Sequence, residues 1–481
     1  MRVLFSAETP LSLTSFQSVV AELGRRGHEV TIAIHEERET GWRDRLLAEI
    51  AAPHVTIERA VVPAGDRWLE LAADVRSALD LYLFLGPRFN ETYRARAWRR
   101  APRPAAALAR TPLGSSPAAR RMISSGLTLA ERALPTNPEI EQFLVDRKPD
   151  VVLFTPYLGL RSMQPEFLRA AKALGLRTAI CVKSWDNLTS KSLVRPVPDR
   201  LFVWNDVQRG EAAALHGIPP ERVAVTGAQC FDDWFVWLPR PREEFCARIG
   251  LDPTRPYVLY ACCSPWTGQD ETEFLRRWLA ALRARGGVLA DAGVLVRPHP
   301  KRPDLRLEDE ACVVFPRDAH APTDRESKAD YYDSIYHSAA VVGLNTSAMI
   351  EAAIVGRPVL TVLDPEWQRV QQGTLHFRYL LEVGGGLLRV AHTLDEHAAQ
   401  LAAAVEGSDD GAERAAAFVA QFVRPLGFDV AATPVFVDEI ERLAGSAAPR
   451  PERTPATLRP LRALLAPLAA RAGRFAHAGE S

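Results

Sequence analysis

Short apolar runs alternate with amphipathic helical stretches along most of the chain, and this alternation limits the fold more than any other feature. The segments 2–7, 15–27 and 28–35 form a strand, a helix and a second strand, and Gly27 stands where the helix must end. Strands that are apolar at nearly every residue need cover on both faces. The pattern therefore predicts an α/β fold with parallel sheets between layers of helices.

The alternation occurs in two successive series, which predicts two Rossmann-like, doubly wound domains facing a central cleft. The first series has strand-like runs at 2–7, 28–35, 54–60, 150–155, 177–182, 200–205 and 222–227. The second has them at 257–262, 293–298, 312–316, 339–344, 358–363 and 386–391. The expected divisions are a first domain at 1–240 with a helical insertion at about 66–135, a second domain at 241–425, a helix at 426–444 that crosses back to the first domain, and a tail at 445–481.

Composition excludes several classes of protein. The 59 basic residues equal the 59 acidic ones, so no net field favours nucleic acid as a partner. The six cysteines show no CxxC pairs, which favours buried thiols in a reducing compartment over disulfides or a zinc site. The start of the sequence has no signal-peptide pattern, and no stretch approaches the ~18 apolar residues that cross a bilayer. We expect a cytoplasmic protein, peripheral to the inner face of the membrane at most. Its Ala-, Arg- and Pro-rich composition is typical of bacteria with GC-rich genomes.

Two basic segments stand out from this balance. Residues 88–110 contain seven arginines among three aromatic residues, and the tail 445–481 has six arginines and two glutamates. Segment 88–110 is either a solvated helix face or a surface that docks on an anionic membrane or glycan. The tail is expected to be disordered, with a short basic helix at a membrane surface or on a partner as the alternative.

The first candidate for chemistry lies at the end of the strand at 293–298. Arg297, His299 and Lys301 follow an apolar run, and prolines keep this stretch extended. Ligands of open parallel sheets bind beyond the carboxyl ends of the strands. Three cationic or hydrogen-bonding side chains there predict a site for an anion, although polar residues at strand ends are often only solvated.

A second candidate is the turn between the strand at 339–344 and the next helix. Asn345, Thr346 and Ser347 stand where that helix begins, and a helix start presents unpaired N–H groups that suit a phosphate. Thr346 or Ser347 can equally serve as a simple helix cap. Glu351 lies one turn further on, where it can accept hydrogen bonds from sugar hydroxyls or offset the helix dipole.

A third candidate is the polar loop after the strand at 177–182. It carries Lys183, Trp185, Asp186 and Asn187. A tryptophan in such a loop needs either burial or a ligand, so a role at the cleft is the favoured interpretation. Asp186 is a candidate general base, and Glu8, directly after the first strand, competes with it for that role. Residues 330–338 place aromatic side chains at helical spacing, which is more typical of a core than of a site.

These stretches resemble a known family. The second series, with His299-Pro300 after one strand and "NTSAMIEA" (345–352) after another, is similar to the donor domain of GT-B glycosyltransferases, especially those that build bacterial surface polysaccharides, and to CDP-glycerol glycerophosphotransferase-like proteins. The opening helix and "RGHEV" (26–30) resemble GT-B acceptor domains. The resemblance implies that His299 and the turn 345–347 hold the donor diphosphate, that Glu351 meets ribose or sugar, and that no metal or other cofactor is needed. Trp266 is a candidate to stack on the base.

The function that this resemblance implies is transfer of a sugar from a nucleotide-activated donor to a hydroxyl acceptor, which can be lipid-linked or polymeric. Three alternatives stay open. A hydrolysing sugar-nucleotide 2-epimerase shares the fold and needs no acceptor. A CDP-polyol phosphotransferase shares the His-Pro feature, and a non-catalytic protein that binds sugar nucleotides shares the binding site alone.

Overall fold

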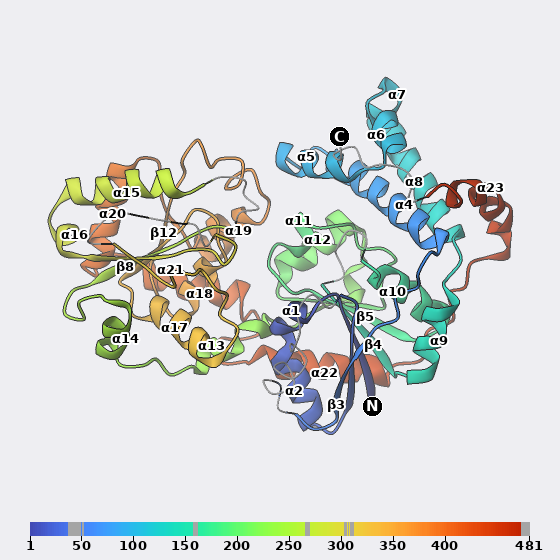
Figure 1. The fold of residues 1–481 in the computed structure, drawn as a ribbon, viewed down its shortest axis with the longest axis horizontal. Coiled ribbons are helices and arrows are strands. Elements are labelled where there is room, and N and C mark those ends of the chain that lie inside the picture. Colours follow the sequence, from blue (N-terminus) through green and yellow to red (C-terminus); the bar gives the residue numbers. More distant parts are fainter. Residues whose placement is uncertain are drawn as a thin grey trace. The chain divides into compact units, whose positions relative to one another are not determined.

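The computed structural model describes residues 1–36, 50, 52–156, 162–264, 270–302, 305, 307 and 312–472. The chain folds into two compact units, one made of Met1–Cys230 with Val430–Ser481, the other of Phe231–Asp429. Each unit is built on one sheet whose described strands are all parallel (Figure 1). The second unit begins before the expected boundary at 241, because Trp234 and Trp237 pack on Tyr332 within it.

The first unit contains a sheet of seven described strands in the order β3-β2-β1-β4-β5-β6-β7. The strands are β1 (Arg2–Ala7), β2 (Glu29–Ile34), β3 (Val55–Arg59), β4 (Val151–Thr155), β5 (Arg177–Cys181), β6 (Arg200–Val203) and β7 (Val223–Val225). The helices are α1 (Pro10–Leu13), α2 (Gln17–Arg25), α4 (Arg67–Phe84), α5 (Glu91–Arg100), α6 (Arg103–Ala109), α7 (Pro112–Ser115), α8 (Pro117–Ala133), α9 (Pro138–Arg147), α10 (Gln164–Ala173), α11 (Asn187–Ser190), α12 (Asp206–His216), α22 (Ala432–Gly445) and α23 (Arg459–Ala469).

The alternation of side chains along β1 explains why both faces of this sheet are covered. Val3 and Phe5 point into a core that α2 and α22 close, while Leu4 joins a second core beneath α9 and α10. Helices α4 to α8 form the predicted insertion between β3 and β4.

Helix α22 brings the end of the chain back to the first unit and packs along α2 (Figure 1). Phe436 lies edge-on to Phe16 and Phe202. At the rim, Arg26 donates to Asp438 at 2.6 Å, and Glu441 lies 2.7 Å from the His28 ring. The core residues show that α22 completes one face of the sheet.

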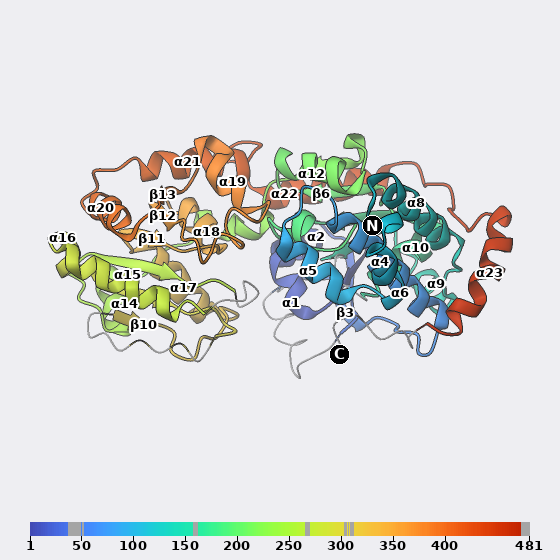
Figure 2. The same ribbon diagram turned by 90° about the horizontal axis from the view of Figure 1, so that it is seen from above.

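The tail differs from its expected disorder. Residues 459–469 form α23, whose buried Leu465 and Ala469 pack against Leu71 and Leu79 of α4 (Figure 2). Thr454 donates to the Leu134 carbonyl at 3.1 Å. The Ala-, Pro- and Arg-rich composition suggested that the tail has too little apolar surface to fold alone. Its leucines instead pack into a core shared with the insertion helices.

The second unit contains a sheet of six described strands in the order β10-β9-β8-β11-β12-β13. Its strands are β8 (Tyr257–Ala261), β9 (Gly293–Arg297), β10 (Cys312–Val314), β11 (Ala340–Val342), β12 (Val359–Val362) and β13 (Arg389–Ala391). Its helices are α13 (Asp232–Val236), α14 (Arg242–Ile249), α15 (Thr272–Arg285), α16 (Val288–Asp291), α17 (Arg325–Tyr336), α18 (Ala348–Ile354), α19 (Phe377–Glu382), α20 (Leu394–Val405) and α21 (Gly411–Phe422). Helices α15 and α20 share one core with the sheet around Trp278.

Candidate functional site

The strand order of the second unit places its topological switch point between β8 and β11. The chain moves from β8 outward to β9 and β10, and then returns to the other side of β8 with β11. Loops diverge at such a point and leave a crevice at the carboxyl edge of the sheet. His299 follows β9 and Asn345 follows β11, so the two lie on either side of β8, about 10 Å apart in sheet geometry.

His299 is held as a neutral hydrogen-bond donor. Its Nδ1 accepts the Lys301 backbone N–H at 3.2 Å, so the ring proton of the neutral form is on Nε2. Burial lowers the pKa of His299, and the nearby charges of Lys301 and Arg302 lower it further. Arg302 is paired with Asp270 at 3.1 Å, and Lys301 is exposed. At neutral pH the group that His299 can offer to an anion is therefore an N–H rather than a full positive charge.

The turn after β11 is fixed to the rest of the sheet. The Asn345 backbone N–H lies 3.1 Å from Cys263 Sγ, and its side-chain amide donates to the Val370 carbonyl. A Cβ at Gly343 would lie 2.9 Å from Thr346 Cγ2, so only glycine allows the turn to fold this closely. Ser347 is exposed at the start of α18. Since α18 has only 7 residues, the turn's exposed polar groups matter more than the helix dipole.

Arg297 and Glu351 come together through a residue that lies far from both in the sequence. The Arg297 guanidinium lies 4.8 Å from the centre of the Tyr331 ring, and the Tyr331 hydroxyl donates to Glu351. Burial raises the pKa of Glu351 to about 7, although Tyr331 and Arg297 both oppose that shift. Arg297 itself is 8% exposed, and its Nη1 has no hydrogen-bond partner among the residues that the structure describes. It therefore stands behind Glu351 rather than at the mouth of the strand.

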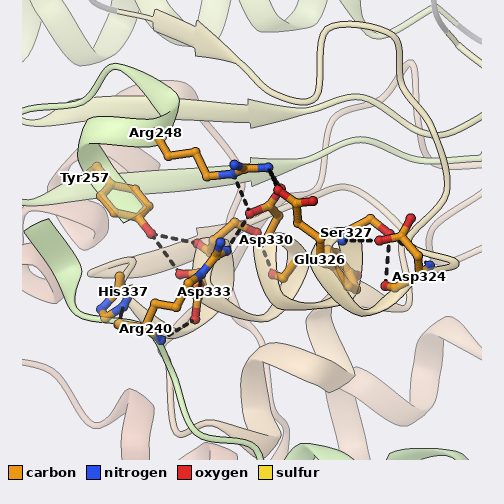
Figure 3. A network of polar contacts seen from close by, with 11 residues as sticks. Arg240, Arg248, Tyr257, Asp324, Glu326, Ser327, Asp330, Asp333 and His337 are labelled. Atoms are coloured by element: carbon orange, nitrogen blue, oxygen red, sulfur yellow. Dashed lines mark hydrogen bonds and ion pairs between the residues drawn. The ribbon is translucent and has the colours of Figure 1, made fainter. Parts of the chain in front are cut away.

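Helix α17 is fixed in rotation by ion pairs (Figure 3). Arg240 donates through Nε to Asp333 at 2.6 Å, and Arg248 donates twice to Asp330 at 3.0 and 3.1 Å. The Tyr257 hydroxyl donates to the Asp333 and Ser334 carbonyls at the end of the helix. Because these contacts occupy one side of α17, Tyr331 on another side is held against Arg297 and Glu351.

A buried carboxyl closes the loop after β8. Glu271 accepts the Cys263 N–H at 2.7 Å and the Tyr260 hydroxyl at 3.0 Å, and burial raises its pKa to about 7. Because Cys263 Sγ also lies beside the Asn345 N–H, Glu271 supports the turn at the switch point indirectly. Trp266, the candidate to stack on a base, lies outside the described residues.

In the first unit, Glu8 occupies the corresponding switch point, between β1 and β4. Its backbone N–H donates to the Thr155 carbonyl at 3.2 Å, and the Ser162 hydroxyl donates to its carboxylate. Gln164 binds the Ser6 and Thr155 carbonyls at 2.8 and 2.7 Å, so the ends of both strands are tied together. Glu8 is thus presented at the carboxyl edge by a rigid frame.

The loop after β5 is braced by its own side chains. Asp186 accepts the hydroxyls of Ser184 and Ser190 at 2.7 and 2.6 Å, and Asn187 accepts the backbone N–H groups of Lys183 and Ser184. Trp185 is 6% exposed, so its ring is buried rather than presented at an exposed loop tip.

Other parts of the first unit also hold this loop. Lys183 Nζ donates to the Leu11 carbonyl at 2.9 Å, and burial lowers the pKa of Lys183 to about 8. His216 donates to the Leu188 carbonyl at 2.8 Å, and Arg96 donates to the Ser190 carbonyl at 2.7 Å. The four loop residues singled out by the sequence are therefore brought together, mainly by contacts that stabilise the loop.

Tyr331 and Glu271 were missed by the sequence interpretation. Tyr331 belongs to a stretch whose aromatic spacing suggested a core, and its neighbour Tyr332 does pack there, stacked on Tyr336. A tyrosine next to two acidic residues on an amphipathic helix was the available signal. Within the described residues, no cluster of three or more metal-ligating side chains occurs.

Comparison with known proteins shows a likeness in structure alone. The sequence matches no protein-family model, and no curated protein sequence matches it. The structure is similar to UDP-GlcNAc 2-epimerase from Neisseria meningitidis bound to UDP-GlcNAc, with TM-score 0.52 and 12% identity over 92% of this chain and 100% of that one. A glycosyltransferase from Rickettsia africae gives TM-score 0.51 and 9% identity over 93% and 99%, and Staphylococcus aureus MnaA with UDP gives 0.51 and 12% over 92% and 96%.

These likenesses extend over nearly the whole chain. The predicted α/β class and the GT-B-like fold are confirmed. No described helix is long and apolar enough to cross a membrane.

Proposed function

We propose that this chain is a glycosyltransferase that moves a sugar from a nucleotide-activated donor to a hydroxyl acceptor. The observation that carries the proposal is the carboxyl edge of the second unit, where the neutral His299 donor and the turn Asn345–Ser347 flank the switch point, with Glu351 on α18. Hydrogen-bond donors fixed in this way suit a diphosphate leaving group, because they need no reorganisation as charge develops.

In this proposal the second unit holds the donor. His299 Nε2–H and the polar atoms of the turn bind the diphosphate, and Glu351 accepts hydrogen bonds from ribose or sugar hydroxyls. Exposed Lys301 adds positive charge near the leaving group. No metal or other cofactor is part of the proposal. Loss of one such donor is expected to slow transfer by about 10²-fold.

We assign the general base of this proposal to Glu8. Its carboxylate follows β1 at the switch point of the first unit, and the Ser162 hydroxyl donates to it and can orient it. Both oxygens of Asp186, in contrast, accept hydroxyls from its own loop, which suits a structural role. A general base must lie where the acceptor binds, and ligands of parallel sheets bind at such a switch point.

The second candidate is a hydrolysing 2-epimerase, favoured by the solved epimerases among the structural neighbours. UDP-GlcNAc, the ligand of the Neisseria structure, is therefore the first donor to test. The two reactions differ in their products. An epimerase releases free nucleotide and an altered sugar without any acceptor, whereas a transferase consumes donor only when a hydroxyl acceptor is added.

The test begins with thermal shift of the full chain against UDP, GDP, CDP, TDP and CMP and their sugar conjugates. Calorimetry on His299→Ala should then show about tenfold weaker binding of the nucleoside diphosphate found. His320→Ala, at a solvent-exposed histidine paired with Asp318, is the matched control and should bind normally. Unchanged affinity of His299→Ala, or no binding of any nucleotide, would refute the assignment of the donor site.

A further inference from the structure

Two helical segments of the first unit carry charge that the proposed reaction does not use. Residues 88–132 contain ten arginines and two glutamates, which gives a net charge of +8. Residues 446–472 contain five arginines and one glutamate, a net charge of +4. In a chain whose acidic and basic residues balance, this concentration of positive charge sets the insertion and the tail apart from the rest.

The tail and the insertion form one helical layer. Helix α23 packs on α4 and α8, and both views show α23 beside α8 (Figures 1 and 2). Arg462 donates through Nε to the Ala133 carbonyl at 2.9 Å, at the end of α8. Leu465 is buried in the shared core. The orientation of α23 is thus set by the protein, and its remaining faces are presented outward.

The outward faces of α8 and α23 carry large apolar side chains. Leu464 is 74% exposed and Leu468, one turn further along α23, is 44% exposed. Met122 and Leu129, two turns apart on α8, are exposed as well. The exposed basic residues on or next to these helices are Arg121, Arg132, Arg459 and Arg471. Each of the two neighbouring helices therefore exposes both apolar side chains and arginines, which can bind a lipid interface and anionic groups respectively.

We propose that α8 and α23 form a docking surface for an anionic lipid bilayer. The leucines and Met122 would enter the interfacial region, and the guanidinium groups would pair with lipid phosphates. A soluble polyanion, such as a charged glycan or nucleic acid, would also attract the arginines. A soluble polyanion would not explain the leucines at exposed positions. The bilayer is therefore the partner that fits both the arginines and the exposed leucines.

The contact would be peripheral and reversible. No described helix can span a membrane, and only a few side chains are available for insertion. Each arginine near an anionic surface contributes enough to change binding about fivefold. Because this term is electrostatic, it should weaken as salt rises.

The experiment is co-sedimentation of the full chain with two kinds of vesicle, phosphatidylcholine alone and phosphatidylcholine mixed with phosphatidylglycerol. We expect binding to the mixed vesicles only. Leu464→Gln with Leu468→Gln should weaken it by about tenfold, and Arg459→Gln with Arg471→Gln by about fivefold for each arginine. The control is Val236→Gln with Leu238→Gln, at apolar residues of the second unit that are 75% and 86% exposed, and it should bind as the original chain does.

Several outcomes would overturn the proposal. Absence of binding to the mixed vesicles would do so directly. An equal loss in the Val236 and Leu238 control would show nonspecific adhesion of exposed apolar residues. Binding to soluble dextran sulfate, with vesicle binding that depends on the arginines but not on Leu464 and Leu468, would identify a polyanion site instead. The proposal does not depend on the reaction, so failure of donor binding would leave it standing.

Discussion

Replacing Glu351 with glutamine should make the protein more stable at alkaline pH, although the glutamate belongs to the proposed donor site. Burial raises the pKa of Glu351 from its usual 4.5 to about 7, so folding costs free energy once the group must ionise. A glutamine keeps a carbonyl oxygen that can accept the Tyr331 hydroxyl and cannot ionise.

The sign follows from proton binding. Between about pH 4.5 and 7 the folded protein holds a proton on Glu351 that the unfolded chain has lost, so the stability of the original protein falls as pH rises through this window. The shift from 4.5 to about 7 corresponds to about 3 kcal/mol when the titration is complete. Roughly 2 kcal/mol of that difference should develop between about pH 5.5 and 8.5.

The measurement is the thermal midpoint of both proteins at these two values of pH. Because a unit of this size shifts by about 2–4 °C per kcal/mol, Glu351→Gln should gain roughly 4–8 °C on the original protein as pH rises. Glu406→Gln, at an exposed glutamate of the same unit, is the control and should follow the original protein. If Glu351→Gln and the original protein changed in parallel with pH, Glu351 would not be buried as described.

Three further predictions concern the frame around the sites. Tyr331→Phe keeps the ring on Arg297 but removes the donor to Glu351, so the pH at which donor binding changes should rise in calorimetry, and an unaltered pH profile would contradict the contact. Asp330→Asn breaks the pairs with Arg240 and Arg248 and should cost about 1–3 kcal/mol in urea unfolding, because Arg240 keeps Asp333 and Arg248 keeps Glu326, whereas a loss under about 0.5 kcal/mol would mean that α17 does not depend on Asp330. In turnover assays at saturating donor, Glu8→Gln should lose activity at normal donor affinity, while Asp186→Asn should mainly lower the midpoint of unfolding; the reverse pattern would make Asp186 the base.

Much of the fold could be predicted from local patterns of apolar and polar residues in the sequence. The strands and helices of both units repeat the periods of 2 and 3.6 residues, and both sheets have the predicted parallel pairing. The predicted ends of short strands are less accurate. The apolar run at 386–391 forms a strand only at Arg389–Ala391, because Gly384, Gly385 and Gly386 adopt positive φ before it.

The site was predictable only as far as strand ends reveal it. His299 and the turn at Asn345 were singled out as candidates because both follow apolar runs. The burial of Arg297 was not predictable, because it depends on the rotation of α17, which the distant Arg240 and Arg248 fix. The burial of Trp185 was not predictable for a similar reason, because the polarity of a loop does not show how far the folded chain covers it.

The return of α22 to the first unit also determines the order in which the molecule can be completed during synthesis. Phe436, Val437 and Ile440 cover one face of a sheet whose first strand, β1, is synthesised long before them. Domains usually finish folding in the order in which they leave the ribosome. Here the residues of the second unit are all synthesised before α22 emerges. The first unit therefore starts first, keeps Phe16 and Phe202 uncovered in the meantime, and is completed last.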